Sequence, residues 1–521
     1  MSSSPSFRRI KPSCSPMDQR YYSKPMDYSY ICRKKIRMSK ALLKSLHSCW
    51  AKWILWGVFT LVIVFLASRH EFWNDEYHVW FMARFLSFRE LWEAMTVEGH
   101  FLLWFLPVRL FAKLGCSFWC LHLLSISLVS AGAWLLIMKG PFNIPADALI
   151  LFSYPLIYWF PVISRCYALI PILLFALAYL YREDKHPILY TVLVGLLAHT
   201  HAYMEGAVAA LFLLWCYERI WIPLKAKRPV RQGIIGAVII LVFVALAYIQ
   251  VTGSLDYGRS HLKFFGFFQT WYPLAKAYCP IPDGMSDDIK AGQFSVLSVS
   301  LLIMTGVLML VALFLLFRIF WKHKGNRKFA FVLVVSVAWQ FVMSLFVYQF
   351  GNHRTYLPLL LVYFALWCVY SKDLCRDTLL LLITFFILTC QCGLMIKDIR
   401  GPFCPDMFIY DAVKEKAPLH SQLYVITEPG SNQVIEDYII PPFIANMFCY
   451  EYDEMLVEPP LDGDYQDYLA SIFKSRRCRE AWCVLINDAA LPSNPWYSCE
   501  TVTEVAGCHL YHITLTDDSL F

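Results

Sequence analysis

The stretch that decides the fold is residues 233–251, which read GIIGAVIILVFVALAYIQV. This run contains no charged residue, and its length is close to the roughly 20 residues that an α-helix needs to cross a bilayer. Four basic residues stand directly before it: Lys225, Lys227, Arg228 and Arg231. Because the cytoplasmic loops of membrane proteins carry an excess of Lys and Arg, this pattern predicts a membrane helix that begins on the cytoplasmic side.

The composition of the whole chain extends this prediction. Of the 521 residues, 58% belong to the apolar set AVILMFWYC, whereas soluble domains contain roughly 45–50% even when glycine is counted. Only 16% are charged, where about a quarter is usual. These values exclude a disordered or collagen-like chain and are not those of a multidomain cytosolic enzyme. We therefore expect a polytopic membrane protein.

Apolar runs that can serve as membrane spans recur along the first 400 residues. They are residues 53–68, 118–138, 148–162, 167–181, 188–198, 202–221, 233–251, 294–317, 329–350, 356–370 and 379–395. A second basic cluster, at residues 318–328, also belongs in the cytoplasm. With these eleven spans, the loops that hold Arg165, His199 and Arg354 fall on the opposite side, together with the C-terminal tail.

A twelfth apolar candidate, residues 100–114, is not counted as a span. It contains Pro107, Arg109 and Lys113, which are poor residues to face lipid. A span here would also place either the N-terminus or the later basic loops on the wrong side of the membrane. We predict that this segment is an amphipathic helix lying at the interface.

Three parts of the chain are expected. Residues 1–50 are basic and lack the pattern of a signal peptide, so they should stay in the cytoplasm. Residues 51–400 should form the transmembrane domain, with an outward loop at 69–117. Residues 401–521 hold 19 acidic and 6 basic residues. They should form a separate, water-exposed domain outside the cytoplasm.

This acidic domain is predicted to be a small mixed α/β unit. Helices are expected at 406–415 and 465–474, and strands at 422–427, 482–486 and 509–514. The domain has six cysteines: Cys404, Cys449, Cys478, Cys483, Cys499 and Cys508. Outside the cytoplasm they can form disulfides, or they can remain reduced and buried, and the sequence leaves both alternatives open.

Two carboxylates, Asp75 and Glu76, stand just after the first apolar run. They admit two explanations. In the first, Asp75 is a helix N-cap and Glu76 lies in the first turn, where a negative charge suits the helix dipole. In the second, one carboxylate takes a proton from an incoming hydroxyl, and the other orients that hydroxyl or holds a divalent cation.

Further polar groups are predicted at the same bilayer surface, where ionisable residues are costly and by default indicate a functional site. Arg165 and Arg354 can each offer a planar fork of donors to a phosphate oxygen, or can simply extend their charge to water. His201 and Glu205 are about one helical turn apart, so they can hold a metal ion with His199, or they can be hydrogen-bonded structure. The sequence has no Gly-rich phosphate loop, CxxC pair or HExxH motif.

The polar segments resemble those of GT-C membrane glycosyltransferases. DEYHVWFMAR at 75–84, LW at 91–92 and EGHFLLW at 98–104 resemble the first outward loop of the bacterial branch related to protein O-mannosyltransferases and aminoarabinose transferases. SRCYAL at 164–169 is similar to an Arg-Asn-Tyr-Ala-Leu segment of that branch. LLAHTH at 196–201 and the pair His353-Arg354 follow in the expected order.

The resemblance implies an all-α polytopic membrane protein with about 11 to 13 transmembrane helices and a small C-terminal α/β extracytoplasmic domain. It implies transfer of a sugar from a polyprenyl-phosphate carrier to a lipid, glycan or protein acceptor, on the non-cytoplasmic face of a bacterial inner membrane. Asp75 would be the general base of an inverting displacement, and Glu76 and Glu98 would orient groups or help to bind a cation. The residues that would bind substrate and lipid phosphate are Glu98, His100, Arg165, Tyr167, His353 and Arg354.

Two other classes of protein remain as alternatives. A transporter or lipid flippase also places charges at membrane depth, but it should carry polar groups along both halves of its path and often has inverted repeats. The sequence shows neither feature. A structural or receptor membrane protein would use Asp75 and Glu76 only to start a helix. Nucleic-acid binding is not expected, because the basic residues stand in short clusters between apolar runs.

Overall fold

A computed structural model describes residues 49–70, 72, 74–95, 101–252, 264–280, 292–391, 393–400, 415–416, 423–427, 479–486, 495–505 and 508–516. Several predicted features lie outside these residues. They are the basic segment before residue 49, Glu98, His100, almost all of the tail helices at 406–415 and 465–474, and three cysteines, Cys404, Cys449 and Cys478.

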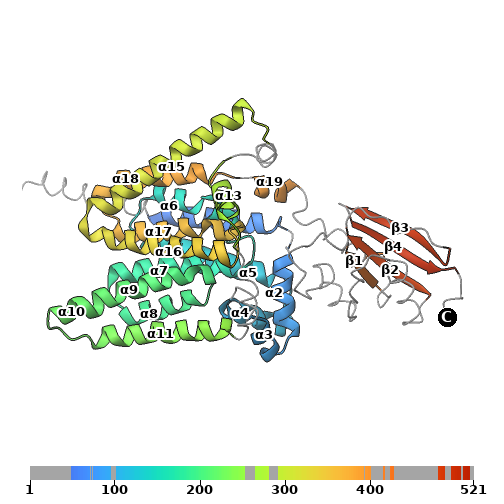
Figure 1. Ribbon diagram of the computed structural model, residues 1–521, viewed down its shortest axis with the longest axis horizontal. Helices are drawn as coiled ribbons and strands as arrows, with labels where there is room; N and C mark the ends of the chain where they lie inside the picture. The colour runs from blue at the N-terminus through green and yellow to red at the C-terminus, as the bar shows by residue number, and fades with distance from the viewer. Residues whose placement is uncertain are drawn as a thin grey trace, which may run out of the picture. The chain divides into compact units, whose positions relative to one another are not determined.

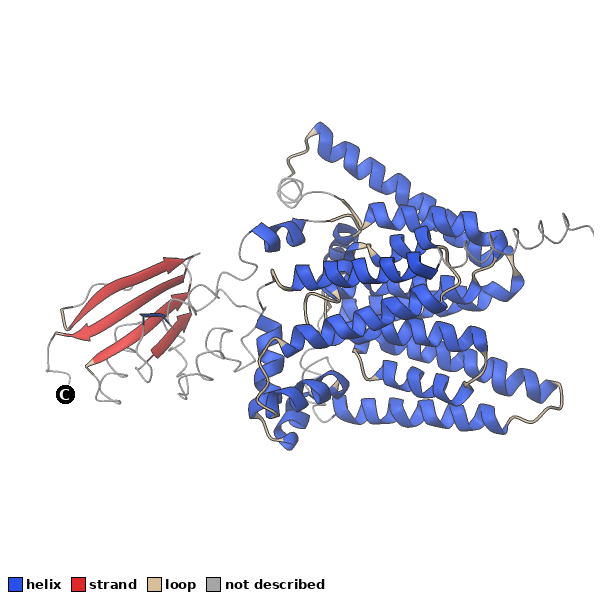
Figure 2. Ribbon diagram, turned by 180° about the vertical axis from the view of Figure 1, so that it is seen from behind, coloured by secondary structure: helices blue, strands red, loops and turns tan. Residues whose placement is uncertain are grey.

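Helices make up the described structure up to residue 400 (Figures 1 and 2). Seven of the described helices are long and apolar enough to cross a membrane: Cys49–Ala67, Cys120–Lys139, Cys166–Glu183, Ala202–Lys225, Arg231–Val251, Val296–Trp321 and Lys324–Phe346. These helices coincide with seven of the eleven apolar runs. They identify the chain as an integral, multi-pass membrane protein, while the total of 11 to 13 spans stays a prediction.

The remaining four runs correspond to shorter elements. These are α6 (Ile144–Leu151) with the π-helix η1 (Pro155–Trp159), α8 (Pro187–Ala198), α17 (Leu357–Val369) and α18 (Cys375–Leu388). Within and between the spans lie α2 (Asn74–Phe85), α3 (Phe88–Met95), α4 (Leu102–Lys113), α5 (Cys120–Lys139), η2 (Cys166–Ala168), α7 (Leu169–Glu183), η3 (Ala202–Met204), α9 (Glu205–Cys216), η4 (Tyr217–Trp221), α10 (Ile222–Lys225), α11 (Arg231–Thr252), α13 (Phe267–Ala277), α15 (Val296–Lys322), η5 (Lys324–Asn326), α16 (Arg327–Phe346), η6 (Asn352–Tyr356), η7 (Lys372–Leu374) and α19 (Gly393–Arg400).

Two of the predicted spans are not continuous helices. The run 148–162 breaks after α6, because Pro155 has no N–H to extend the helical hydrogen bonds and begins η1 instead. The run 379–395 breaks between α18 and α19. Each of these two apolar runs is therefore divided between two helical elements. The elements that follow the two breaks, η1 and α19, carry Tyr158 and Asp398, which belong to the buried polar cluster described in the next section.

Small residues let the helices of the bundle approach one another closely. A Cβ atom added at Gly195 of α8 would lie 2.5 Å from the ring of Phe243 on α11, and one at Gly206 of α9 would lie 2.3 Å from Trp339 on α16. α7 packs against α5, α8 and α17 (Figure 1). Because α7 and α17 bury most of their apolar side chains, they form the centre of the packing.

The segment 100–114 is helical, while its predicted place at the membrane interface stays a prediction. It forms the twelve-residue helix α4, which is not among the described helices long and apolar enough to span. α4 packs against α2, and the guanidinium of Arg109 donates to the carbonyl oxygens of Ala83 (3.1 Å) and Leu86 (2.7 Å). These carbonyls lie at the C-terminal end of α2, where a positive charge is favourable. α4 therefore helps to hold α2, which carries the acidic pair.

The described part of the tail is a four-stranded sheet (Figure 2). Its strands are β1 (Leu423–Thr427), β2 (Glu480–Ile486), β3 (Tyr497–Val505) and β4 (Cys508–Leu515), in the order β1-β2-β4-β3. β1 and β2 are parallel, and the other pairs are antiparallel. The three predicted strands are confirmed. β3 was not predicted, because its sequence, YSCETVTEV, is largely polar.

Two of the tail cysteines can be assigned. Cys483 on β2 is buried, Cys499 on β3 is exposed, and both are free thiols. β4 lies between these two strands, so the two thiols belong to strands that are not neighbours. No bond joins this pair, and the choice between disulfides and reduced cysteines in the whole tail stays open.

Candidate functional site

The acidic pair begins α2, but its two side chains have different surroundings. The helix starts at Asn74, so both carboxylates lie in its first turn, and the interpretation of Asp75 as the N-cap is wrong. The Asp75 side chain is 44% exposed, whereas that of Glu76 is completely buried. Successive residues of a helix point about 100° apart. One carboxylate is therefore open to solvent and the other faces the interior.

Asp75 forms an ion pair with Arg165. Arg165 has an extended backbone and stands immediately before η2 and α7, so it lies at the start of a predicted span. Its side chain is only 8% exposed. Burial lowers the pKa of Arg165, and the nearby positive charge of Arg354 acts in the same direction. An arginine nevertheless keeps its charge in proteins, so this site contains a buried cation beside an accessible carboxylate.

Arg354 approaches the same place from η6. Its Nε donates to the carbonyl oxygen of Gln349 at 3.1 Å, and its Cζ lies 4.1 Å from the centre of the Tyr348 ring. The guanidinium also hydrogen-bonds to the hydroxyl of Tyr167. Two arginines from distant parts of the sequence thus meet around Tyr167, as the count of spans predicted.

Tyr167 is held by two histidines. Nδ1 of His201 accepts a hydrogen bond from the backbone N–H of Tyr203 at 3.1 Å, so in the neutral ring the proton is on Nε2. That Nε2 lies 3.0 Å from the Tyr167 hydroxyl and donates to it. The ring of His353 stacks on the Tyr167 ring, with 4.6 Å between the centroids and an angle of 8° between the planes. The Tyr167 hydroxyl thus joins His201 to the guanidinium of Arg354.

Glu76 belongs to a buried polar cluster behind this site. One carboxylate oxygen accepts the backbone N–H of Ser164 at 2.6 Å, and the other lies 3.2 Å from Nε2 of His70. Nδ1 of His70 lies 2.8 Å from a carboxylate oxygen of Asp398 on α19, and the Tyr158 hydroxyl donates to that same oxygen at 3.0 Å. Both oxygens of Glu76 therefore have protein donors, which does not fit the predicted role as a cation ligand.

Burial by itself lowers the pKa of His70, but the two carboxylates outweigh it and raise that pKa to about 9. His70, Tyr158, Ser164 and Asp398 were not predicted as site residues. One signal was available in the sequence. His70 follows the first apolar run and Asp398 follows the last, and the count of spans puts both ends on the side of Asp75.

The three predicted metal ligands do not come together. Nε2 of His199 lies 3.0 Å from the carbonyl oxygen of Phe243 on α11, whereas His201 is occupied by Tyr167 and Tyr203. Within the described residues, no group of three His, Cys, Asp or Glu side chains is arranged to hold a metal ion. His199, His201 and Glu205 therefore do not fit a shared metal, and we assign no chemical step to one.

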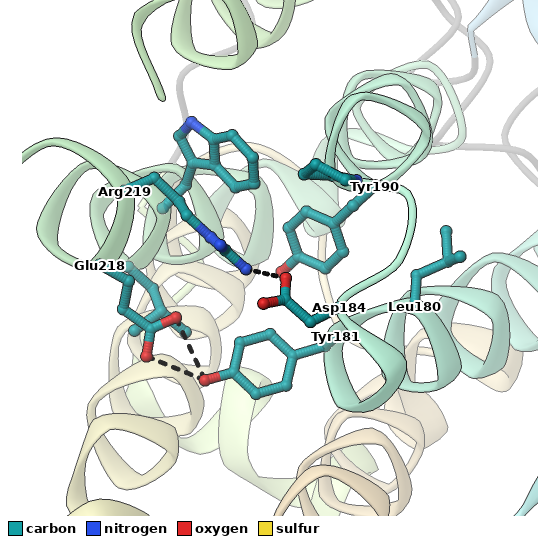
Figure 3. A pocket seen from close by; sticks show the side chains of 9 residues that line it. Leu180, Tyr181, Asp184, Tyr190, Glu218 and Arg219 are labelled. Carbon is teal, nitrogen blue, oxygen red and sulfur yellow. Dashed lines mark hydrogen bonds and ion pairs between the residues drawn. The ribbon is translucent and has the colours of Figure 1, made fainter. Parts of the chain in front are cut away.

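A second group of charged residues lies at the other end of α7. Figure 3 shows the Tyr181 hydroxyl bonded to the carboxylate of Glu218, and Arg219 paired with Asp184. The cavity that these residues line has a volume of about 20 Å³, which is room for about one water molecule. Tyr181 follows Tyr167 by 14 residues, or about 20 Å of helix. This small cavity is therefore separate from the site at Arg165.

Comparison with known proteins gives two similar solved structures. No protein-family profile and no curated protein matches the chain. The crystal structure of ArnT from Cupriavidus metallidurans bound to undecaprenyl phosphate is similar, with a TM-score of 0.49, 12% identity, and coverage of 90% of this chain and 98% of that one. The apo structure of the same protein gives a TM-score of 0.46, 11% identity, and coverage of 91% and 98%. At this low identity, the substrates of the present chain have to be argued from its own residues.

Proposed function

We propose that this chain is an integral membrane glycosyltransferase that moves a sugar from a polyprenyl-phosphate carrier to an acceptor hydroxyl. The observation that carries the proposal is the pairing of the accessible carboxylate of Asp75 with the buried guanidinium of Arg165, next to Arg354 and Tyr167. A base and a phosphate-binding cation in contact are what a displacement at a phosphate-linked sugar requires. The resemblance of residues 75–104 and 164–169 to GT-C enzymes supports it further.

The reaction follows from the positions of these groups. Asp75 takes the proton of the acceptor hydroxyl as its oxygen attacks the anomeric carbon of the sugar. The new bond forms on the face opposite the carrier, so the configuration inverts. The bond between the anomeric carbon and the phosphate oxygen breaks, and its electron pair stays on the phosphate. Arg165 and Arg354 stabilise the charge that develops there.

The finer features remain part of this proposal. Glu98 and His100 are assigned to binding the acceptor or the sugar, and His353 to supporting Tyr167. The active site and the acidic C-terminal domain are proposed to lie outside the cytoplasm of a bacterial cell. The donor sugar is a hexose or a pentose, and the acceptor is a lipid, a glycan of the cell envelope or a protein.

The test uses purified protein in lipid nanodiscs with a panel of synthetic polyprenyl-phosphate sugars. Release of polyprenyl phosphate is followed by mass spectrometry, with an extract of bacterial membrane lipids as the acceptor mixture. We expect release with at least one donor, and we expect the purified protein to carry polyprenyl phosphate that Arg165→Ala protein lacks. If the protein neither holds this lipid nor consumes any donor, but moves lipid across a bilayer, the flippase alternative replaces the proposal.

A further inference from the structure

The buried cluster behind the site is centred on a histidine between two carboxylates. Nε2 of His70 faces Glu76 at 3.2 Å and Nδ1 faces Asp398 at 2.8 Å, and the side chains of all three residues are at most 2% exposed. A neutral imidazole has one N–H, so one ring nitrogen would direct its lone pair at an ionised carboxylate. The geometry therefore favours the imidazolium, which donates to both acids.

The cluster reaches Arg165 through one backbone contact. Glu76, held by His70, accepts the N–H of Ser164 at 2.6 Å, and Ser164 directly precedes Arg165. The Ser164 hydroxyl also lies 2.8 Å from Nδ1 of His122 on α5. The residue before Arg165 is thus fixed both at its backbone and at its side chain. Arg165 itself has an extended backbone, whose carbonyl oxygen accepts the N–H of Ala168 at 3.0 Å at the start of η2.

We propose that Asp398 and His70 are positioning residues for Arg165: Asp398 holds His70, His70 holds Glu76, and Glu76 fixes the backbone at Ser164. This inference rests on the proposed function for the role of Arg165, but not for the contacts themselves. Asp398 lies on α19, the last described helix before the acidic tail. The end of the membrane part of the chain therefore supports an active-site arginine more than 230 residues earlier in the sequence.

The charge of His70 makes this arrangement dependent on pH. The groups that face it are Glu76 from α2, Asp398 from α19, His122 from α5, with ring centroids 5.8 Å apart, and Tyr158 of η1 through Asp398. The pKa of His70 is raised from its ordinary 6.5 to about 9. Its contribution to stability is therefore complete below about pH 6.5 and is lost as the pH rises through about 9.

The experiment measures amide hydrogen exchange by mass spectrometry on the full chain in nanodiscs, between pH 6 and pH 10. Exchange at Ser164 is divided by its intrinsic rate at each pH. In the parent protein we expect this protection to be constant up to about pH 8 and to fall near pH 9. If the protection of the Ser164 amide in the parent protein does not change between pH 6 and pH 10, the proposal is wrong.

The variant Asp398→Asn keeps an acceptor for the Nδ1 proton of His70 but removes the negative charge. The pKa of His70 should therefore fall, and the loss of protection at Ser164 should move to lower pH. Asp377→Asn is the matched control, because Asp377 of α18 is also buried and is paired with a cation, Arg318, at 3.0 Å. The control should keep the parent profile. If Asp398→Asn also keeps it, the proposal is wrong.

Turnover provides the second readout. At pH 8.5 we expect kcat/KM of Asp398→Asn for the donor to be about tenfold below the parent, as for loss of a charge-assisted hydrogen bond. At pH 6 the ratio of variant to parent should recover, because His70 is protonated again. A deficit that is equal at both pH values indicates a general loss of structure and overturns the positioning role. If neither the parent protein nor any variant transfers sugar, the proposed function is wrong. The hydrogen-exchange result then still shows whether Asp398 and His70 hold the backbone at Ser164.

Discussion

Asp75 and Arg165, which are 90 positions apart in the sequence, form an ion pair in which the acid is 44% exposed and the base only 8%. This asymmetry agrees with the different roles that we propose for the two residues. A buried guanidinium cannot leave its place, whereas an accessible carboxylate can exchange its partner for an incoming hydroxyl. In the proposed reaction, a phosphate that binds to Arg165 replaces Asp75 as its partner, and the released carboxylate takes the proton of the acceptor hydroxyl.

The first prediction concerns Asp75. Asp75→Asn should reduce turnover about 10²- to 10⁴-fold while the protein stays folded, because the amide can accept a bond from Arg165 but cannot take up a proton. The measurement is sugar transfer from a polyprenyl-phosphate donor, with thermal unfolding in parallel. Asp184→Asn is the matched control, since Asp184 also forms an ion pair with an arginine, Arg219, but at the other end of α7. Near-parental turnover of Asp75→Asn would exclude Asp75 as the base.

The second prediction concerns the two arginines. Arg165→Ala and Arg354→Ala should each weaken binding of polyprenyl phosphate by about tenfold or more, because each removes a charge-assisted contact. Lysine should substitute poorly, since it offers no planar fork of donors. Binding is measured by titration with the lipid in nanodiscs, and Arg219→Ala serves as the control. Parental affinity in both alanine variants would show that the phosphate binds elsewhere.

The third prediction separates Glu76 from Asp75. Because Glu76 is fully buried and bonded to His70 and Ser164, Glu76→Gln should lower the free energy of unfolding by about 1–3 kcal/mol. Asp75→Asn should leave the free energy of unfolding nearly unchanged, because the Asp75 side chain is partly exposed. The check is the thermal midpoint of both variants near pH 7. A Glu76→Gln protein that is as stable as the parent but inactive would instead make Glu76 a catalytic residue.

The fourth prediction concerns orientation in the membrane. Basic residues near Lys225 and at 318–328 predict a cytoplasmic location for those loops, so the C-terminus should lie on the other side. A reporter that is active only outside the cytoplasm should therefore be active when fused after Phe521. A second fusion within the loop between α10 and α11 should be inactive. The opposite pattern would reverse the proposed side of the active site.

Hydropathy and charge alone predicted the helical class and eleven spans, of which seven coincide with long apolar helices among the described residues. Arg165, Tyr167, His353 and Arg354 were expected on one face, and the structure brings them together. This succeeds because the bilayer acts on every helix separately: a run of apolar residues must cross it, and each crossing changes the side on which the next loop lies. Such information is present in short windows of sequence.

Only the tertiary structure decided which side chains work together. It separates Asp75 from Glu76, joins His201 to Tyr167 rather than to a metal, and brings Asp398 to His70 across 328 positions of the chain. The physical reason is that neighbouring residues of a helix point about 100° apart, so their surroundings depend on which other helices pack nearby. Contacts of this kind depend on how close the helices approach at residues such as Gly195, and no local pattern of hydropathy contains that information.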